Sequence, residues 1–292
     1  MSELTPGTVA ANGVEFAYLS IGAPDAPLAL CLHGFPDTAW TWRHLLPQLA
    51  DAGFRAVAPF QRGYAPTSIP ADGLFQSGVL GVDANALHGA LGGDERAAII
   101  GHDWGASGTY AAATLQPQRW SKVVTASVPT ANALPVAFFT DPEAVKRSWY
   151  MFFFLSPLAD LLVPANDLAF IDMLWRDWSP GYDASGDLPR VKAALGDPAN
   201  LAAAIGYYRA TLGDGKKDPA LAEAQAATQA VPTQPTLYLH GRNDGCIGAG
   251  MAEYMSTVVP SHVTVEIIEE CGHFLHLERP DVVNRRILDF LA

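Results

Sequence analysis

The alternation of hydrophobic and polar segments along the chain predicts buried strands separated by helices. Apolar or alternating runs of the strand type fill much of the first half, at residues 14–21, 28–33, 55–59, 96–100 and 122–126. A helix-like pattern at residues 78–91 and a run of small residues at 106–115 lie between them. Apolar strands that alternate with helices are typical of a parallel sheet covered by helices on both faces. We therefore predict an α/β protein with a doubly wound, mostly parallel sheet.

This pattern is interrupted in the middle of the chain. Residues 133–230 contain few strand patterns, many aromatic residues, and breaks such as Ser179-Pro180-Gly181. Strand-like runs return at residues 235–240 and 263–269, and an amphipathic helix is expected at 281–291. We interpret residues 1–132 as the first part of a core, residues 133–230 as an inserted helical cap, and residues 231–292 as the second part of the core.

Composition and charge narrow the class of protein. The 292 residues are 49% apolar and 16% charged, as in a well-packed soluble protein. The formal net charge of −12 argues against nucleic acid or an anionic membrane surface as a partner. Three cysteines without metal-ligand spacing, and a beginning without signal-peptide features, predict a cytoplasmic protein. We expect no cofactor and no metal, and either a monomer or a homodimer.

The most informative motif is Gly-His-Asp-Trp-Gly at residues 101–105. It follows an apolar run and precedes a helix-like run, which together indicate a nucleophile elbow. Its central residue is Asp103, where an esterase would carry serine. A carboxylate would displace a leaving group from a saturated carbon, and water would then hydrolyse the resulting ester. The motif therefore predicts a substrate with an electrophilic sp³ carbon, such as an epoxide or a carbon–halogen bond.

Hydrolysis of such an ester needs a base and an acid that orients it. The order expected after this elbow is nucleophile, acid, histidine. Asp244 follows the strand-like run 235–240, and His273 follows the run 263–269, so both lie at carboxyl ends of strands, where open α/β sheets place their sites. Asp244 could also be a simple turn residue. His273 and His276 could form a metal pair, but no third ligand cluster accompanies them.

The hydrolysis also needs donors for an oxyanion. The turn after residues 28–33 could present the backbone N–H of Phe35, and Trp104 would supply the N–H of the residue after the nucleophile. One such donor stabilises a transition state by roughly 3 kcal/mol.

Together these residues resemble the α/β-hydrolase-fold epoxide hydrolases. The resemblance rests on His33-Gly34-Phe35-Pro36, residues 101–105, Asp244, and Gly272-His273-Phe274 with Glu278-Arg279-Pro280; Arg62-Gly63-Tyr64 is also similar. Phe60 replaces a common Asp and Ala65 a usual Gly, and both differences affect the shape of a loop that carries no chemistry in the family. The resemblance implies the α/β-hydrolase fold.

The family also uses two cap tyrosines, which protonate the epoxide oxygen. Residues 150–157 match the first pattern and point to Tyr150; residues 206–209 match the second and point to Tyr208, with Tyr207 as the alternative. On pattern alone, both would be taken for core residues. The aromatic side chains beside Tyr150 predict an apolar substrate pocket; they are Trp149, Phe152, Phe153 and Phe154.

The resemblance implies an epoxide hydrolase that converts an apolar epoxide and water to a vicinal diol through an alkyl ester on Asp103. The alternative is a haloalkane or haloacid dehalogenase with the same nucleophile. A haloalkane dehalogenase would use Trp104 as a halide donor but usually has Asn where this chain has Phe35. A haloacid enzyme would have arginines in place of Trp104 and Ser107. A third possibility is a non-enzymatic ligand-binding protein, although such proteins often have damaged catalytic residues.

Overall fold

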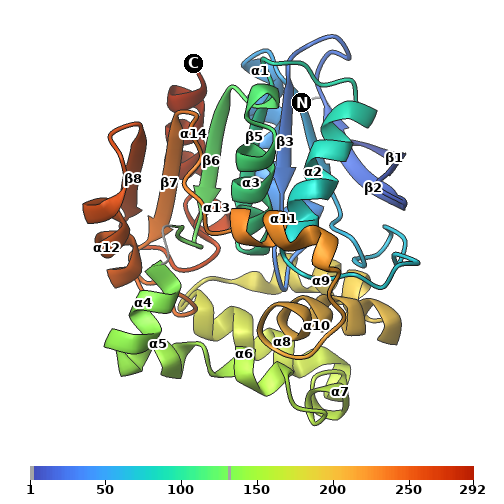
Figure 1. The fold of residues 1–292 in the computed structure, drawn as a ribbon, viewed down its shortest axis with the longest axis vertical. Coiled ribbons are helices and arrows are strands. Elements are labelled where there is room, and N and C mark those ends of the chain that lie inside the picture. The colour runs from blue at the N-terminus through green and yellow to red at the C-terminus, as the bar shows by residue number, and fades with distance from the viewer. Residues whose placement is uncertain (1–2, 131–132) are drawn as a thin grey trace.

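Eight strands form one sheet in the computed structural model, which describes residues 3–130 and 133–292 (Figure 1). Their order across the sheet is β1-β2-β4-β3-β5-β6-β7-β8. The strands are β1 (Thr5–Ala11), β2 (Val14–Ile21), β3 (Leu28–Leu32), β4 (Arg55–Pro59), β5 (Ala98–His102), β6 (Lys122–Ala126), β7 (Thr236–Gly241) and β8 (Val263–Ile268). β2 is antiparallel to β1 and β4, and the other neighbours are parallel. The predicted mostly parallel α/β sheet is confirmed.

Helices cover both faces of the sheet because the central strands are buried on both sides. In β3, Leu28 and Leu30 pack with α2 (Gly78–Ala90) and α3 (Trp104–Leu115), whereas Ala29 and Cys31 pack with α1 (Leu46–Asp51) and α14 (Pro280–Leu291). This alternation follows from the two-residue period of a strand. α12 (Gly250–Val258) covers β7 and β8.

Among its described residues, the part of the chain between β6 and β7 contains helices and connecting loops but no strand. It contains α4 (Ala133–Thr140), α5 (Pro142–Arg147), α6 (Trp149–Phe154), α7 (Ala159–Leu162), α8 (Ala165–Trp178), α9 (Leu188–Leu195), α10 (Pro198–Leu212) and α11 (Ala222–Ala227). Helices α4 to α10 lie across one end of the sheet (Figure 1). α11 instead packs on α2 and α3 of the core. The boundaries at 132 and 230 stay predictions, and residues 131–132 lie outside the described part.

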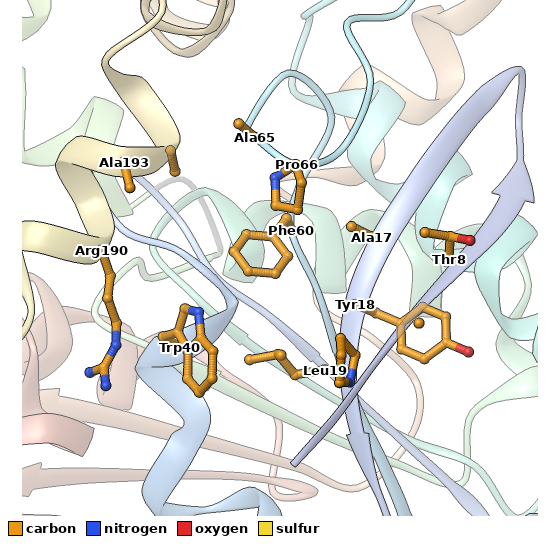
Figure 2. Close-up of a pocket in the computed structure, with 13 residues that line it drawn as sticks. Thr8, Ala17, Tyr18, Leu19, Trp40, Phe60, Ala65, Pro66, Arg190 and Ala193 are labelled. Atoms are coloured by element: carbon orange, nitrogen blue, oxygen red, sulfur yellow. The ribbon is translucent and has the colours of Figure 1, made fainter.

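A shallow groove of about 670 Å³ lies where α9 meets the first strands (Figure 2). Its lining is mainly apolar and includes Leu19, Trp40 and Phe60, and the Arg190 guanidinium lies over the Trp40 ring. None of the residues that line it belongs to the predicted catalytic set.

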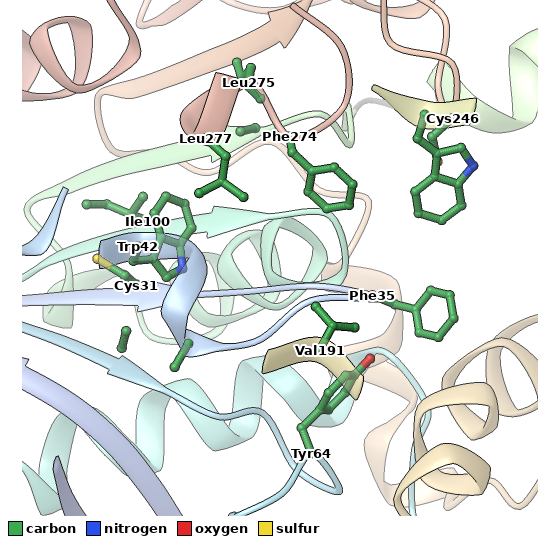
Figure 3. Close-up of a cluster of buried hydrophobic side chains, with 14 of the residues drawn as sticks. Cys31, Phe35, Trp42, Tyr64, Ile100, Val191, Cys246, Phe274, Leu275 and Leu277 are labelled. Atoms are coloured by element: carbon green, nitrogen blue, oxygen red, sulfur yellow. The ribbon is translucent and has the colours of Figure 1, made fainter. Parts of the chain in front are cut away.

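The largest hydrophobic cluster continues from the sheet into the cap. Figure 3 shows Cys31 and Ile100 on adjacent strands with Trp42 beside them, and Phe35 beyond the end of β3. The Phe35 ring packs edge-to-face on Phe154 of α6 and on Tyr208 of α10, at centroid distances of 5.4 and 5.3 Å. These aromatic contacts hold the cap over the carboxyl ends of the strands. A site can therefore form between the cap and the core.

Among the residues described, no helix is both long and apolar enough to cross a membrane. The cytoplasmic location and the monomeric or homodimeric state inferred from the sequence stay predictions.

Candidate active site

Asp103 lies in a sharp turn between β5 and α3. Its φ is +54°, in a region that residues other than glycine rarely adopt. Glycines on both sides of Asp103 allow the start of α3 to lie close to β3 and β5. A Cβ on Gly105 would overlap the Leu32 carbonyl, and one on Gly101 would overlap the Gly105 carbonyl. The turn therefore presents the Asp103 carboxylate at the carboxyl end of the sheet.

The loop after β3 brings a backbone donor to this carboxylate. The N–H of Phe35 donates to Oδ1 of Asp103 at 2.8 Å. Gly34 is needed for this approach, because a Cβ there would overlap the carboxylate of Asp103. Trp104 is the first residue of α3, so its N–H has no acceptor within the helix. Both predicted donors therefore lie next to Asp103, and their part in binding an oxyanion stays a prediction.

The predicted base and acid meet Asp103 from the loops after β8 and β7. Nδ1 of His273 lies 2.9 Å from Oδ2 of Asp244, and Nε2 of His273 lies 3.7 Å from Oδ2 of Asp103. Oδ1 of Asp244 accepts the N–H groups of Cys246 and Ile247, both at 2.8 Å. His273 is fully buried, and Asp103 and Asp244 are also buried. The three residues thus form one connected acid–base system.

The charges of this system favour a protonated His273. Burial alone would disfavour the charged imidazole, but the carboxylates of Asp244 and Asp103 outweigh burial and raise the pKa of His273 to about 10. Burial likewise opposes ionisation of Asp103, whereas His273 and the N–H of Phe35 favour it and leave the pKa of Asp103 below its usual value. These pKa shifts favour an imidazolium at His273 beside an ionised Asp103.

A cavity of about 250 Å³ opens beside Asp103 between the cap and the core. Apolar side chains make up much of its wall; its lining is Ser77, Asp103, Trp104, Ser107, Val128, Leu134, Pro135, Met151, Tyr208, Thr211, Leu212, Gln225, Thr228, Gln229 and Ile247. The hydroxyl of Tyr208 and Nε1 of Trp104 are buried, and neither has a hydrogen-bond partner within residues 3–130 and 133–292. Both groups are free to donate to a bound molecule.

Of the two predicted cap tyrosines, Tyr208 lines this cavity, whereas Tyr150 is its neighbour and is not among the lining residues. Tyr150 of α6 and Tyr208 of α10 have ring centroids 5.8 Å apart. Burial raises the pKa of both phenols well above 10, so both keep their protons. The hydroxyl of Tyr207 instead donates to the Arg62 carbonyl at 2.7 Å. Of the two register alternatives, Tyr208 is the one that lines the cavity.

The predicted aromatic pocket needs correction, because none of its four residues lines the cavity. Trp149 and Phe152 are 42% and 48% exposed, and Phe153 stacks on Phe170. Phe154 is buried, but it packs behind the site on Phe35 and Tyr208. A helix turns only one side toward the core, and in α6 that side carries Tyr150 and Met151.

The end of α8 is hydrogen-bonded to the loops that carry Asp244 and His273, a contact that the sequence analysis did not predict. The carbonyl of Trp178 accepts the N–H groups of Gly245 and His273, both at 3.0 Å. The hydroxyl of Ser179 donates to Glu278 at 2.6 Å and accepts the N–H of Phe274 at 3.1 Å. Sequence reasoning identified residues 179–181 only as a break between helices, since nothing local indicates where a helix end will dock.

A second unanticipated residue is Cys246. Its Sγ lies 3.1 Å from the hydroxyl oxygen of Tyr150. The sequence feature that could have identified Cys246 is its position two residues after Asp244, because that spacing keeps its side chain near the predicted acid.

Within the described residues, two buried groups of three side chains each bring their possible metal-ligand atoms within 4.8 Å of one another. One group is Asp37, His102 and His276, and the other is Asp244, Cys246 and His273. In the second group the acid and the histidine bond each other, and burial raises the pKa of the thiol well above its usual value, whereas a metal needs the thiolate. In the first group, burial lowers the pKa of His102 to about 3, which leaves a neutral imidazole. Burial also raises the pKa of Asp37 to about 8, so this group offers little negative charge to a cation at neutral pH.

Comparisons with known proteins point in one direction. The α/β hydrolase fold family model matches residues 27–280. Epoxide hydrolase A of Mycobacterium tuberculosis is 30% identical over 330 residues, covering 100% of this chain and 98% of that protein. Human epoxide hydrolase 4 is 28% identical over 288 residues, covering 96% of this chain and 76% of that protein. The crystal structure of epoxide hydrolase A from Mycobacterium thermoresistibile superimposes with a TM-score of 0.80 at 27% identity, covering 99% and 98% of the two chains.

Proposed function

Because the chain belongs to the epoxide hydrolase family of the α/β-hydrolase fold, we propose that it hydrolyses an epoxide to a vicinal diol through an alkyl ester on Asp103. This membership confirms the family and the fold that the motifs predicted. The observation that supports the proposal most is that the Asp103 carboxylate and the Tyr208 phenol line one mainly apolar cavity.

In the first step Oδ2 of Asp103 attacks a ring carbon, and the carbon–oxygen bond of the epoxide breaks. The electron pair of that bond goes to the ring oxygen, which takes a proton from Tyr150 or Tyr208. A buried tyrosinate is unfavourable here, because the pKa of each phenol is well above its usual value. The phenol therefore regains a proton, ultimately from the protonated His273 in the native protein and from water where His273 is replaced. The products of the step are a hydroxyalkyl ester and a neutral imidazole.

Ester formation itself prepares His273 to act as a base. The charge of Asp103 is one of two that raise the pKa of His273, and the ester no longer carries it. The pKa of His273 then falls, so the neutral imidazole can accept a proton from water. The hydroxide attacks the ester carbonyl, and Oδ1 becomes the oxyanion beside the N–H of Phe35. On collapse the bond from the carbonyl carbon to Oδ2 breaks, and the leaving alkoxide takes the remaining proton of the attacking water to give the diol. Asp103 is then a carboxylate again and His273 an imidazolium.

The lining of the cavity supports an apolar substrate. Leu134, Met151 and Ile247 form apolar parts of its wall, and two of its polar side chains, Gln225 and Ser77, are hydrogen-bonded to each other. A small aryl or alkyl epoxide could place its apolar group among these residues and its oxygen against Tyr208.

A dehalogenase is the second candidate, because Nε1 of Trp104 is buried in the cavity wall without a partner in the described chain. An unpaired indole N–H is a suitable donor for a leaving halide. Phe35 occupies the position of the usual second side-chain donor, and two phenols have no part in releasing a halide. We therefore favour the epoxide.

The experiment that tests the proposal uses the variant His273→Gln. It is incubated with styrene oxide and, separately, with 1-chlorobutane, and the intact protein mass is recorded. Without the base, the ester should accumulate. We expect an adduct of the full styrene oxide mass on the peptide that contains Asp103, and no adduct in Asp103→Ala. An alkyl adduct from chlorobutane alone would assign the protein to the dehalogenases instead.

A further inference from the structure

The thiol of Cys246 contacts the phenol of Tyr150 inside the protein. Sγ and the phenol oxygen are 3.1 Å apart, and both residues are fully buried. Within residues 3–130 and 133–292, neither the thiol nor this hydroxyl makes another hydrogen bond that meets ordinary geometry. The N–H of Cys246 donates to Asp244. Cys246 thus connects the loop of the catalytic acid to the first cap tyrosine.

The contacts around Cys246 fix the position of the thiol. Asp244 is held by His273 on one side, and the N–H of Gly245 donates to the Trp178 carbonyl on the other. The Trp178 ring packs on the ring of Tyr150 at 4.8 Å between centroids. The thiol and the phenol therefore meet as parts of one packed unit that joins cap and core.

The chemical state of the thiol allows it to donate, and either atom of the contact could be the donor. Burial raises the pKa of Cys246 well above its usual value, and the charges of Asp244 and Asp103 add to the effect. The group is a neutral S–H, which can donate one hydrogen bond. The phenol oxygen of Tyr150 can accept that bond and still donate its own proton.

On the basis of the epoxide hydrolysis proposed above, we infer that Cys246 is a positioning residue for Tyr150: its S–H donates to the phenol oxygen and directs the phenol proton toward the ring oxygen of the substrate. As the ring opens, negative charge grows on the phenol oxygen. A hydrogen bond to a charged acceptor is stronger than one to a neutral acceptor, so the contact tightens in the transition state.

The test measures Cys246→Ala and Cys246→Ser, each in the wild-type and the Tyr150→Phe backgrounds, by rapid-quench rates of ester formation with styrene oxide. One neutral hydrogen bond corresponds to roughly a fivefold to tenfold rate effect. We expect Cys246→Ala to slow ester formation by about that factor with little change in KM. Cys246→Ser should keep most of the rate, and neither change should matter in the Tyr150→Phe background.

Cys31→Ala is the matched control, because Cys31 is a buried thiol of β3 that belongs to the core. It should lower the melting temperature without changing the rate of ester formation. A second readout is the infrared S–H stretch of the otherwise wild-type protein, which should shift to higher frequency in Tyr150→Phe when the thiol loses its acceptor.

The inference is overturned if Cys246→Ala forms ester as fast as the wild type or faster. That result is expected if the Tyr150 hydroxyl donates to the sulfur. An equal loss in the Tyr150→Phe background, or an unchanged S–H stretch, would also overturn it. If the wild type forms no diol from any epoxide while the S–H stretch shifts as expected, the proposed function is wrong and the inferred role falls with it, although the contact itself stands.

Discussion

Replacing Asp244 by asparagine separates the two steps of the proposed reaction. In the native protein Oδ1 of Asp244 accepts two backbone N–H groups at 2.8 Å, and Oδ2 accepts Nδ1–H of His273 at 2.9 Å. Asparagine has the same shape but only one acceptor oxygen. If that oxygen stays with the backbone groups, the amide NH₂ faces His273. The imidazole must then carry its proton on Nε2, which faces Asp103 and can no longer accept a proton from water.

The size of the effect follows from what is lost. Losing a charged hydrogen bond costs roughly 1.5–3 kcal/mol, and a wrong imidazole tautomer in serine proteases lowers turnover by about 10⁴-fold. We therefore expect ester hydrolysis to slow by between about 10²- and 10⁴-fold. Ester formation should slow much less, because Asp103 keeps its contact with the N–H of Phe35.

The assay is a rapid-quench single turnover followed by intact mass, with the exposed substitution Asp281→Asn as control. The ester should accumulate in Asp244→Asn and stay transient in the control. If Asp244→Asn hydrolyses its ester at the rate of the control, Asp244 is only a turn residue and the assigned acid is wrong.

Three further predictions concern the same site. Tyr208→Phe should slow ester formation by about 10–100-fold, measured by rapid quench, because a proton donor is lost. Tyr207→Phe should leave that rate unchanged and lower the unfolding free energy, measured with urea, by about 1 kcal/mol. Gly34→Ala should form little ester while keeping its circular dichroism spectrum, because its Cβ overlaps the carboxylate of Asp103; a native rate of ester formation would show that the loop can move aside. The raised pKa of His273 should stabilise the fold below pH about 6.5 and lose that contribution as the pH rises toward 10, so His273→Gln should flatten the pH dependence of the unfolding free energy over this range.

The core could be predicted because its strands are apolar segments that are buried on both faces. β2 and β4 were predicted with the same ends that the structure shows, residues 14–21 and 55–59. β1 was missed because it contains Pro6 and Gly7, lies at the edge of the sheet, and is largely exposed. An edge strand needs no apolar pattern, so little in its sequence distinguishes it from a loop.

The site was predictable where it depends on the ends of strands and was not where it depends on how the cap docks. Asp244 and His273 follow strands, so the topology alone brings them to Asp103. The aromatic run of α6 has a helical period, and only tertiary packing decides which of its side chains face the cavity. The choice between Tyr207 and Tyr208 and the contact of Cys246 depend on the same docking, which residue patterns do not encode locally.

The most direct test of the central claim is a single turnover of the wild-type protein in H₂¹⁸O, with enzyme in excess over styrene oxide. If Asp103 is the nucleophile, the oxygen added to the substrate comes from the carboxylate. The first diol is then unlabelled, and the peptide that contains Asp103 gains one ¹⁸O. If instead the first diol carries ¹⁸O and the peptide none, water attacks the epoxide directly and no ester is formed on Asp103.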